Sequence, residues 1–431
     1  MESSVTVEAK IKSCSSKNVV IELNIPLVRS MLTGEDVIQA ALNAAGELAT
    51  AELLKLFDTD GSPIEIGSLR FTSKGEVSKE YETPYGKINI DRHVYQNHSG
   101  GNTFCPMDKD ARIIGSATPK LAKQISNKYS RSSVDEVKDD LKSNHSRSLS
   151  RGHIQNIAEK VGNIAISKEE DWGYVPKFES EVSTIAIGMD GAMMLMRDDG
   201  YREAMSGTIT FYDDNGDRLH TDYIASTPEY GKSQFFNRMN REIEKVKKIY
   251  PQASYVGIAD GASDNWTFLE SHTTKQITDF YHASEYLAKA SQAIFNKNQE
   301  KKRIIWLEEH CHNLKHEQDS VIEQLEEFKN IASNRRLSAS NKEKLDATIT
   351  YFTNQGPRMN YAEYKKHNYP IGSGVTEAAC KTTIKQRLCR SGMRWKDRGA
   401  AIVLRLKCLD KSKRWEQFWS KINQYGVPAA A

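Results

Sequence analysis

The sequence has few cysteines and prolines for its 431 residues, and it has no long run of apolar residues. Its 6 cysteines are scattered without a Cys-x-x-Cys pair, which is typical of reduced thiols rather than of a disulfide framework. No stretch approaches the roughly 18 uninterrupted apolar residues of a membrane-spanning helix. The start, Met1–Ser4, lacks the basic and apolar segments of a secretory signal. We therefore expect a cytoplasmic protein that has no membrane partner.

The sequence also lacks a large excess of charge of either sign, because 60 Lys and Arg nearly balance 57 Asp and Glu, for a net charge of +3. At roughly 100–200 residues per domain, the length allows about two to four domains. Changes in periodicity and charge divide the chain into six predicted segments: an N-terminal α/β region (1–118), a helix-turn-helix-like DNA-binding segment (119–180), the first part of an α/β core (181–296), a helical insertion (297–365), the closing helix of the core (366–392), and basic, aromatic C-terminal helices (393–431).

The N-terminal region changes from helical to strand patterning. Apolar residues recur at helical spacing over 36–57, and strands are predicted at 69–71 and 85–95. This succession predicts a small α/β region ahead of the DNA-binding segment.

Three short helices follow, with a polar, basic turn between the last two. Pro119 opens the first, a Ser133–Glu136 capping box begins the second, and Ser150 starts the third. The pattern resembles a helix-turn-helix, whose last helix enters a major groove; a plain helical linker is the alternative. Arg147 and Arg151 are the predicted DNA contacts of this segment.

The following part has the order three strands, helix, strand, helix, strand, helix. This order is the ribonuclease H-like arrangement of an α/β layered sheet. Strands are predicted at 184–190, 204–212, 218–225, 255–260 and 277–281, with a hairpin turn at 213–216 and helices at 232–250 and up to 290. Residues 299–354 are highly charged and contain no Pro or Gly, which predicts an all-helical insertion into the core.

Two predicted strands end on the same Asp-Gly-Ala tripeptide, at Asp190–Ala192 and Asp260–Ala262. A carboxylate at the carboxyl end of a strand lies in the crevice where α/β sheets bind ligands. The glycine after it leaves room for a large substrate. The alternative is that each Asp only starts a turn. A third acid, Glu377, falls near the first turn of a helix for which Ser373 is the N-cap.

Three carboxylates on separate elements suit the cleavage of a phosphodiester bond. Two Mg²⁺ ions about 3.5–4 Å apart stabilise the entering and leaving oxygens of an in-line attack. Mg²⁺ prefers hard oxygen ligands and keeps several waters, so a few carboxylates suffice. We expect Asp190 to bridge both ions and Asp260 and Glu377 to hold one ion each, with Mn²⁺ able to substitute.

Several motifs resemble those of the ISKra family of bacterial insertion-sequence DDE transposases. The resemblance covers roughly residues 188–419 and, more loosely, the region from Tyr85. The motifs occur in the same order as in the family: Gly200–Met205, Pro228–Lys232, Gly257–Ala262, Asp279–Ala283, Tyr369–Lys381 and Arg390–Trp395. The resemblance implies a ribonuclease H-like core and metal-dependent cutting and joining of DNA. It assigns the catalytic acids to Asp190, Asp260 and Glu377.

The resemblance also brings an acid-x-x-His signature at Asp279 and His282. It implies that His282 contacts DNA at the scissile phosphate or the flanking strand, and that Asp279 orients its imidazole ring. A strand-end acid and a histidine with purely structural hydrogen bonds are the alternative.

Basic residues crowd the chain directly after the third acid. Lys and Arg side chains neutralise phosphates and release counterions, whereas a solvated charged face is the alternative. The predicted DNA contacts here are Lys381, Lys385, Arg387, Arg390 and Arg394.

Together these features predict a DNA transposase that binds terminal inverted repeats and target DNA. It would act as a homodimer or larger complex on DNA, in the cytoplasm and associated with the nucleoid. Two alternatives remain: a structure-specific nuclease that cuts without strand transfer, and a catalytically inert DNA-binding protein derived from a transposase.

Overall fold

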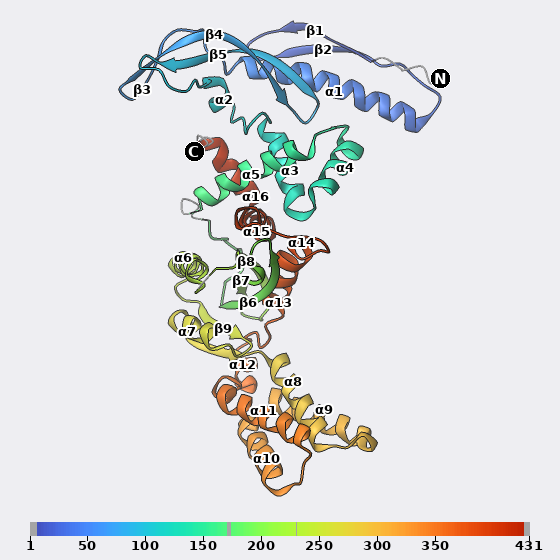
Figure 1. Ribbon diagram of the computed structural model, residues 1–431, viewed down its shortest axis with the longest axis vertical. Helices are drawn as coiled ribbons and strands as arrows, with labels where there is room; N and C mark the ends of the chain where they lie inside the picture. The colour runs from blue at the N-terminus through green and yellow to red at the C-terminus, as the bar shows by residue number, and fades with distance from the viewer. Residues whose placement is uncertain (1–6, 170–173, 230, 426–431) are drawn as a thin grey trace. The chain divides into compact units, whose positions relative to one another are not determined.

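The computed structural model describes residues 7–169, 174–229 and 231–425; Tyr230, within one of the quoted motifs, lies outside these ranges. The protein is 52% helix and 22% strand with a mixed sheet, which confirms the predicted α/β class. The chain divides into two compact units, Met1–Trp172 with Arg405–Ala431, and Gly173–Leu404 (Figure 1). Among the described residues, no helix combines the length and the apolar content needed to cross a membrane.

The first unit contains two small antiparallel sheets. One pairs β1 (Glu8–Cys14) with β2 (Val19–Asn24), and the other has the order β3 (Ile64–Ile66), β4 (Leu69–Glu82), β5 (Lys87–Asn97). Between them in sequence lies α1 (Met31–Lys55), which begins earlier than the predicted 36–57 because Ser30 caps it by accepting from the amide of Thr33.

The remaining elements of this unit are helical. The three predicted short helices are present as α3 (Pro119–Arg131), α4 (Val134–His145) and α5 (Arg151–Ser167), with α2 (Pro106–Asp110) before them and α16 (Trp415–Tyr425) from the C-terminal part. Ser133 and Glu136 form the predicted capping box of α4, and Ser150 caps α5.

The second unit contains a five-stranded mixed sheet of order β10-β9-β6-β7-β8. The antiparallel strands are β6 (Thr184–Met196), β7 (Gly200–Tyr212) and β8 (Arg218–Ser226); β9 (Ser254–Ala259) and β10 (Lys275–Thr278) run parallel to β6. The intervening helices are α6 (Ser233–Ile249), α7 (Ser263–His272) and α8 (Phe280–Ile294), so the predicted order of elements is confirmed.

The predicted strand 277–281 is too long at its carboxyl end. β10 stops at Thr278 because the carboxylate of Asp279 accepts a hydrogen bond from the amide of Tyr281 (2.7 Å) and caps α8. Tyr281 therefore belongs to the helix.

Both faces of the sheet are covered. Successive side chains along β6 point to opposite faces of the sheet, and apolar residues occur on both. Ile185, Ile187 and Met189 pack in one cluster with α6 and α7. Ala186 and Val256 belong to a second cluster on the other face, which continues through α8 into the insertion.

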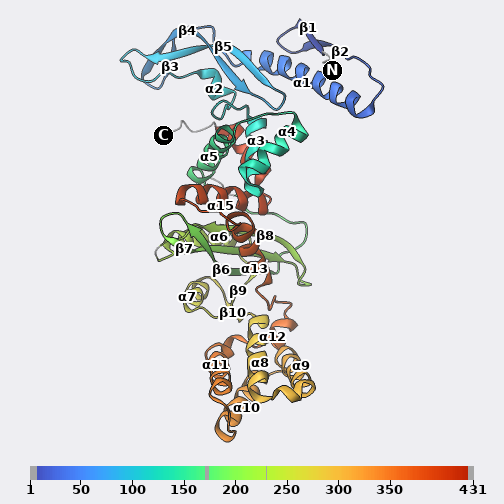
Figure 2. The same cartoon turned by 45° about the vertical axis from the view of Figure 1, so that its right-hand side comes forward.

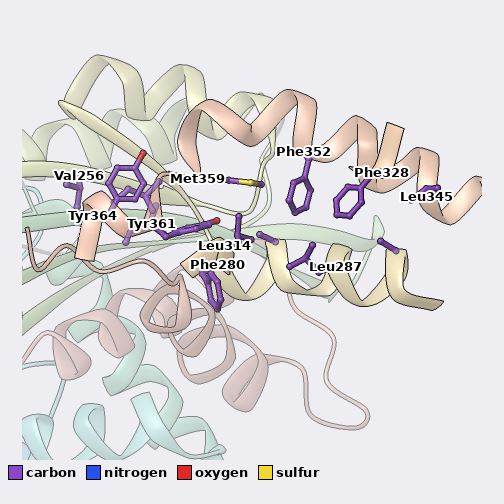
Figure 3. Close-up of a cluster of buried hydrophobic side chains, with 14 of the residues drawn as sticks. Val256, Phe280, Leu287, Leu314, Phe328, Leu345, Phe352, Met359, Tyr361 and Tyr364 are labelled. Carbon is purple, nitrogen blue, oxygen red and sulfur yellow. The ribbon is translucent and has the colours of Figure 1, made fainter. Parts of the chain in front are cut away.

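The insertion is all helical, as predicted. It consists of α9 (Glu300–His316), α10 (Ser320–Asn334), α11 (Ala339–Gln355) and α12 (Tyr361–Lys366), with short 3₁₀ turns at Lys297–Gln299 and Gly356–Arg358. Figures 1 and 2 show these helices gathered around α8. Phe328 and Phe352 point toward Leu287 of α8 (Figure 3), so the insertion shares a core with the sheet.

After the insertion, one continuous helix was predicted and a broken one is found. α13 (Gly374–Ala379) passes into a π-helical turn, η3 (Cys380–Lys385), and then into the short α14 (Gln386–Leu388). The last long helix of this part of the chain is α15 (Asp397–Lys411).

Candidate active site

Three aspartates stand in register on three neighbouring parallel strands. Strand β6 was predicted to stop at Asp190 but continues to Met196, because residues 190–196 pair with β7; Asp260 and Asp279 directly follow β9 and β10. Gly188 of β6 pairs with Ile258 of β9, which pairs with Ile277 of β10. Two residues beyond this row come Asp190, Asp260 and Asp279. Adjacent strands lie about 4.8 Å apart, so the backbones of these acids lie side by side at the carboxyl ends of β9 and β10, beside the middle of β6. The structure thus places Asp190 and Asp260 on adjacent strands and adds Asp279 to the row.

Helix α13 brings Glu377 to the same edge. Its residue Thr376 lies directly on the sheet, where its hydroxyl is 2.8 Å from that of Thr208 on β7. Gly188 makes this approach possible, because a Cβ there would lie 2.1 Å from the Thr376 Oγ1.

The turn after Glu377 contacts Asp190. The thiol of Cys380 is buried, and both burial and a hydrogen bond to the Asp190 carboxylate raise the pKa of that thiol. Cys380 lies three residues after Glu377, so the helical segment that carries the third acid contacts the first.

The insertion holds the loop that carries Asp260. The hydroxyl of Tyr351 on α11 donates to the Asp260 carbonyl (2.8 Å), and the amide of Gln355 donates to the Gly261 carbonyl (3.3 Å). The Tyr351 ring stacks on Tyr286 of α8 at a centroid distance of 3.8 Å. Burial, together with nearby groups that include Asp260, raises the pKa of Tyr351. Sequence reasoning missed this clamp, since Tyr351 follows Asp260 by 91 residues without a motif.

The glycines after the two aspartates do not leave room for substrate, which corrects the prediction. A Cβ at Gly191 would lie 2.2 Å from the Glu203 Oε1, and Glu203 is paired with Lys232 at 2.8 Å. Gly261 has φ +126° and would place a Cβ 3.2 Å from the amide nitrogen of Gln355. The positive φ of Gly261 therefore requires glycine, whereas the space beside Gly191 is filled by the Glu203 side chain.

The carboxylates share an edge but do not form a closed metal site. Among the residues that the structure describes, no three His, Cys, Asp or Glu side chains are arranged to hold a metal ion. The residue types nevertheless fit Mg²⁺, which needs only one or two carboxylates and keeps its waters. Asp260 and Glu377 are exposed and Asp190 is half-buried.

Asp279 does not orient His282, which corrects a second expectation. Its carboxylate oxygens accept from the amide of Tyr281 and from the hydroxyl of Ser373. The His282 Nδ1 lies 3.8 Å from the Glu285 Oε2 instead, and its side chain is 40% exposed. The imidazole is also 6.4 Å from the Tyr351 ring, so it stays close to the clamp on Asp260.

Four of the predicted basic contacts are exposed on the segment that follows Glu377: Lys381, Lys385, Arg390 and Arg394. This segment packs along β6 beyond Asp190, because the Trp395 amide donates to the Leu195 carbonyl (3.1 Å) and the Arg197 amide donates to the Trp395 carbonyl (2.8 Å). The segment that carries these charges therefore runs along β6 from Asp190 toward Met196.

Two predicted DNA contacts are buried instead. Arg387 is 2% exposed, with its guanidinium 5.5 Å from the centre of the Trp395 ring. In the first unit, Arg147 is 7% exposed and forms an ion pair with the buried Glu82. Buried guanidinium groups with such partners stabilise packing, so neither arginine is retained as a DNA contact. Arg151 is exposed at the start of α5, 3.2 Å from Asp135.

Comparison of the chain with protein-family models finds no match, and comparison with curated proteins also finds none. The function is therefore argued from the side chains at this edge of the sheet and from the motifs in the sequence.

Proposed function

We propose that the protein is a DNA transposase of an insertion sequence, which cuts the ends of its element and joins them to target DNA. The observations that support the proposal are the positions of Asp190 and Asp260 on adjacent strands, and the contact of Asp190 with Cys380 in the turn after Glu377. The order of strands and helices supports a ribonuclease H-like core. The motif resemblance supports the transposase class.

The three carboxylates would hold two Mg²⁺ ions, or Mn²⁺ in their place. When bound, such ions activate the attacking water or 3′-hydroxyl and neutralise charge on the leaving oxygen. The exposed Lys381 and Lys385 lie on the helical segment directly after Glu377. They would neutralise phosphates on either side of the bond that is cut.

Binding of the terminal inverted repeats is proposed for the helical part of the first unit. Helix α5 begins with the exposed Arg151, and a helix N-terminus favours a phosphate. Strand transfer needs both ends of the element at once, so we propose a homodimer or larger complex assembled on nucleoid DNA.

The test uses the genomic DNA that flanks the coding sequence, which should contain inverted repeats. The purified full chain should nick these repeats in Mg²⁺ and transfer the freed 3′ ends to a plasmid, and EDTA should abolish both reactions. Asp190→Asn, Asp260→Asn and Glu377→Gln should each lose cleavage while still binding the DNA. Asp214→Asn is the matched control, because this exposed acid lies in the hairpin turn after β7, at the opposite end of the sheet strands.

The outcomes separate the proposal from its alternatives. Cleavage by the Asp190→Asn protein would refute the assigned site. Nicks without joined product would indicate a structure-specific nuclease. DNA binding without any cleavage in Mg²⁺ or Mn²⁺ would indicate an inert DNA-binding protein.

A further inference from the structure

A fourth acid at the sheet edge is shielded from solvent. Asp279 is 0% exposed, although it lies in the same row as Asp190 and Asp260. A buried carboxylate requires hydrogen-bond partners. Asp279 has two, because one oxygen accepts from the Tyr281 amide at 2.7 Å and the other lies within hydrogen-bond reach of the Ser373 hydroxyl, which can donate to it or to Glu377. Asp279 is therefore fixed in place and has no contact with substrate.

Ser373 is the N-cap of α13, yet its hydroxyl does not cap the helix. Its backbone carbonyl accepts from the amides of Thr376 (2.7 Å) and Glu377 (3.0 Å). Its hydroxyl instead contacts two carboxylates, that of Asp279 and the Oε1 of Glu377 at 2.7 Å. An N-cap serine normally accepts from a helix amide, so this side chain serves another purpose.

The two contacts of the Ser373 hydroxyl are not equivalent. A hydroxyl has one hydrogen, so it donates to only one carboxylate at a time. Asp279 stays in place whichever way that hydrogen points, because the amide of Tyr281 also holds it. Glu377 is exposed, and Ser373 is the group that fixes the position of its Oε1.

We propose that Ser373 is a positioning residue, whose hydroxyl donates to the Glu377 carboxylate and orients it toward a divalent cation. The inference rests on the proposed function, in which Glu377 is a metal ligand. Carboxylates that bind metals are held by hydrogen bonds from a second set of residues, and loss of such a bond lowers metal affinity by about 10–100-fold. The Ser373 hydroxyl supplies such a bond here.

The test is a titration of the full chain with Mn²⁺, followed by electron paramagnetic resonance and without DNA. Ser373→Ala should weaken Mn²⁺ binding about 10-fold or more, whereas Ser373→Thr retains the hydroxyl and should bind Mn²⁺ nearly as the wild type does. Ser284→Ala is the matched control, since this hydroxyl on α8 donates to the Tyr281 carbonyl (2.6 Å). It should leave Mn²⁺ affinity unchanged.

Asp279→Asn keeps the inference testable if Ser373→Ala does not fold. The amide oxygen can still accept from Tyr281, and the amide nitrogen can donate to the Ser373 oxygen. The Ser373 hydrogen is then left to Glu377, so Mn²⁺ should bind at least as tightly as in the wild type. Normal Mn²⁺ affinity in Ser373→Ala, or weakened affinity in a folded Asp279→Asn, would overturn the inference alone. Wild-type binding that is absent, or that Asp190→Asn leaves unchanged, would overturn the proposed function and this inference with it.

Discussion

Gly188→Ala should separate the first acid from the third. The added methyl group would lie 2.1 Å from the Thr376 Oγ1 and 3.1 Å from the Thr208 Oγ1, inside van der Waals contact. Neither neighbour is the end of a long flexible side chain, so α13 must shift outward. Glu377 follows Thr376 directly, and the shift would move it away from Asp190.

The expected cost is moderate. Overpacking of a buried site costs about 1–3 kcal/mol, and loss of the hydrogen bond between Thr208 and Thr376 costs about 1 kcal/mol. Replacing a glycine inside a strand returns about 0.5–1 kcal/mol. We therefore expect the free energy of unfolding to fall by about 1–3 kcal/mol, and cleavage of the repeat DNA to fall far more because the acids are no longer adjacent.

A double variant tests this reasoning. In Gly188→Ala with Thr376→Ala, the clashing hydroxyl is gone and the nearest remaining atom of residue 376 is its Cβ, 3.2 Å from the new methyl. The double variant should unfold at a higher urea concentration than Gly188→Ala alone. Two independent destabilising changes would instead lower the unfolding midpoint further, so this result would show that residues 188 and 376 interact. Equal unfolding midpoints for Gly188→Ala and the wild type, with normal cleavage, would refute the close approach of α13 to β6.

Two further changes test the insertion. Tyr351→Phe keeps the stacked ring but loses the hydrogen bond to the Asp260 carbonyl. It should lower the free energy of unfolding by about 1 kcal/mol and slow DNA cleavage. Tyr364→Phe is the control, because it loses a longer hydrogen bond (3.4 Å) to another strand carbonyl and should leave cleavage unchanged. A hydrogen bond from His310 lowers the pKa of Glu327 below its usual 4.5, so this acid stabilises the fold fully above pH 4.5 and progressively less as the pH falls through its folded pKa. Thermal melting of Glu327→Gln should therefore show a deficit at neutral pH that shrinks in acid; a deficit independent of pH would contradict the assignment.

The local patterns of the sequence were sufficient for most secondary structure. The capping box at Ser133 and the hairpin turn that begins at Asp213 both formed as predicted, because their hydrogen bonds join residues a few positions apart. The predicted boundary between strand and helix was wrong at Asp279, because the Asp279 side chain caps α8 there and residues 280 and 281 belong to the helix. The π-helical turn after α13 was missed because no periodicity distinguishes it from an ordinary helix.

By itself, the sequence determined which residues carry charge and that an acid follows β9, since these are properties of short windows. It did not determine that β6 continues past Asp190, because pairing with β7 extends that strand to Met196. Only the tertiary structure decided that Asp279 joins the row, that Tyr351 holds the Asp260 loop, and that Arg387 is buried rather than free to meet DNA. The physical reason is that strand register and helix packing join residues as far apart as Asp279 and Ser373, 94 positions along the chain. Burial and hydrogen-bond partners at such distances follow from the whole fold, and no local pattern encodes them.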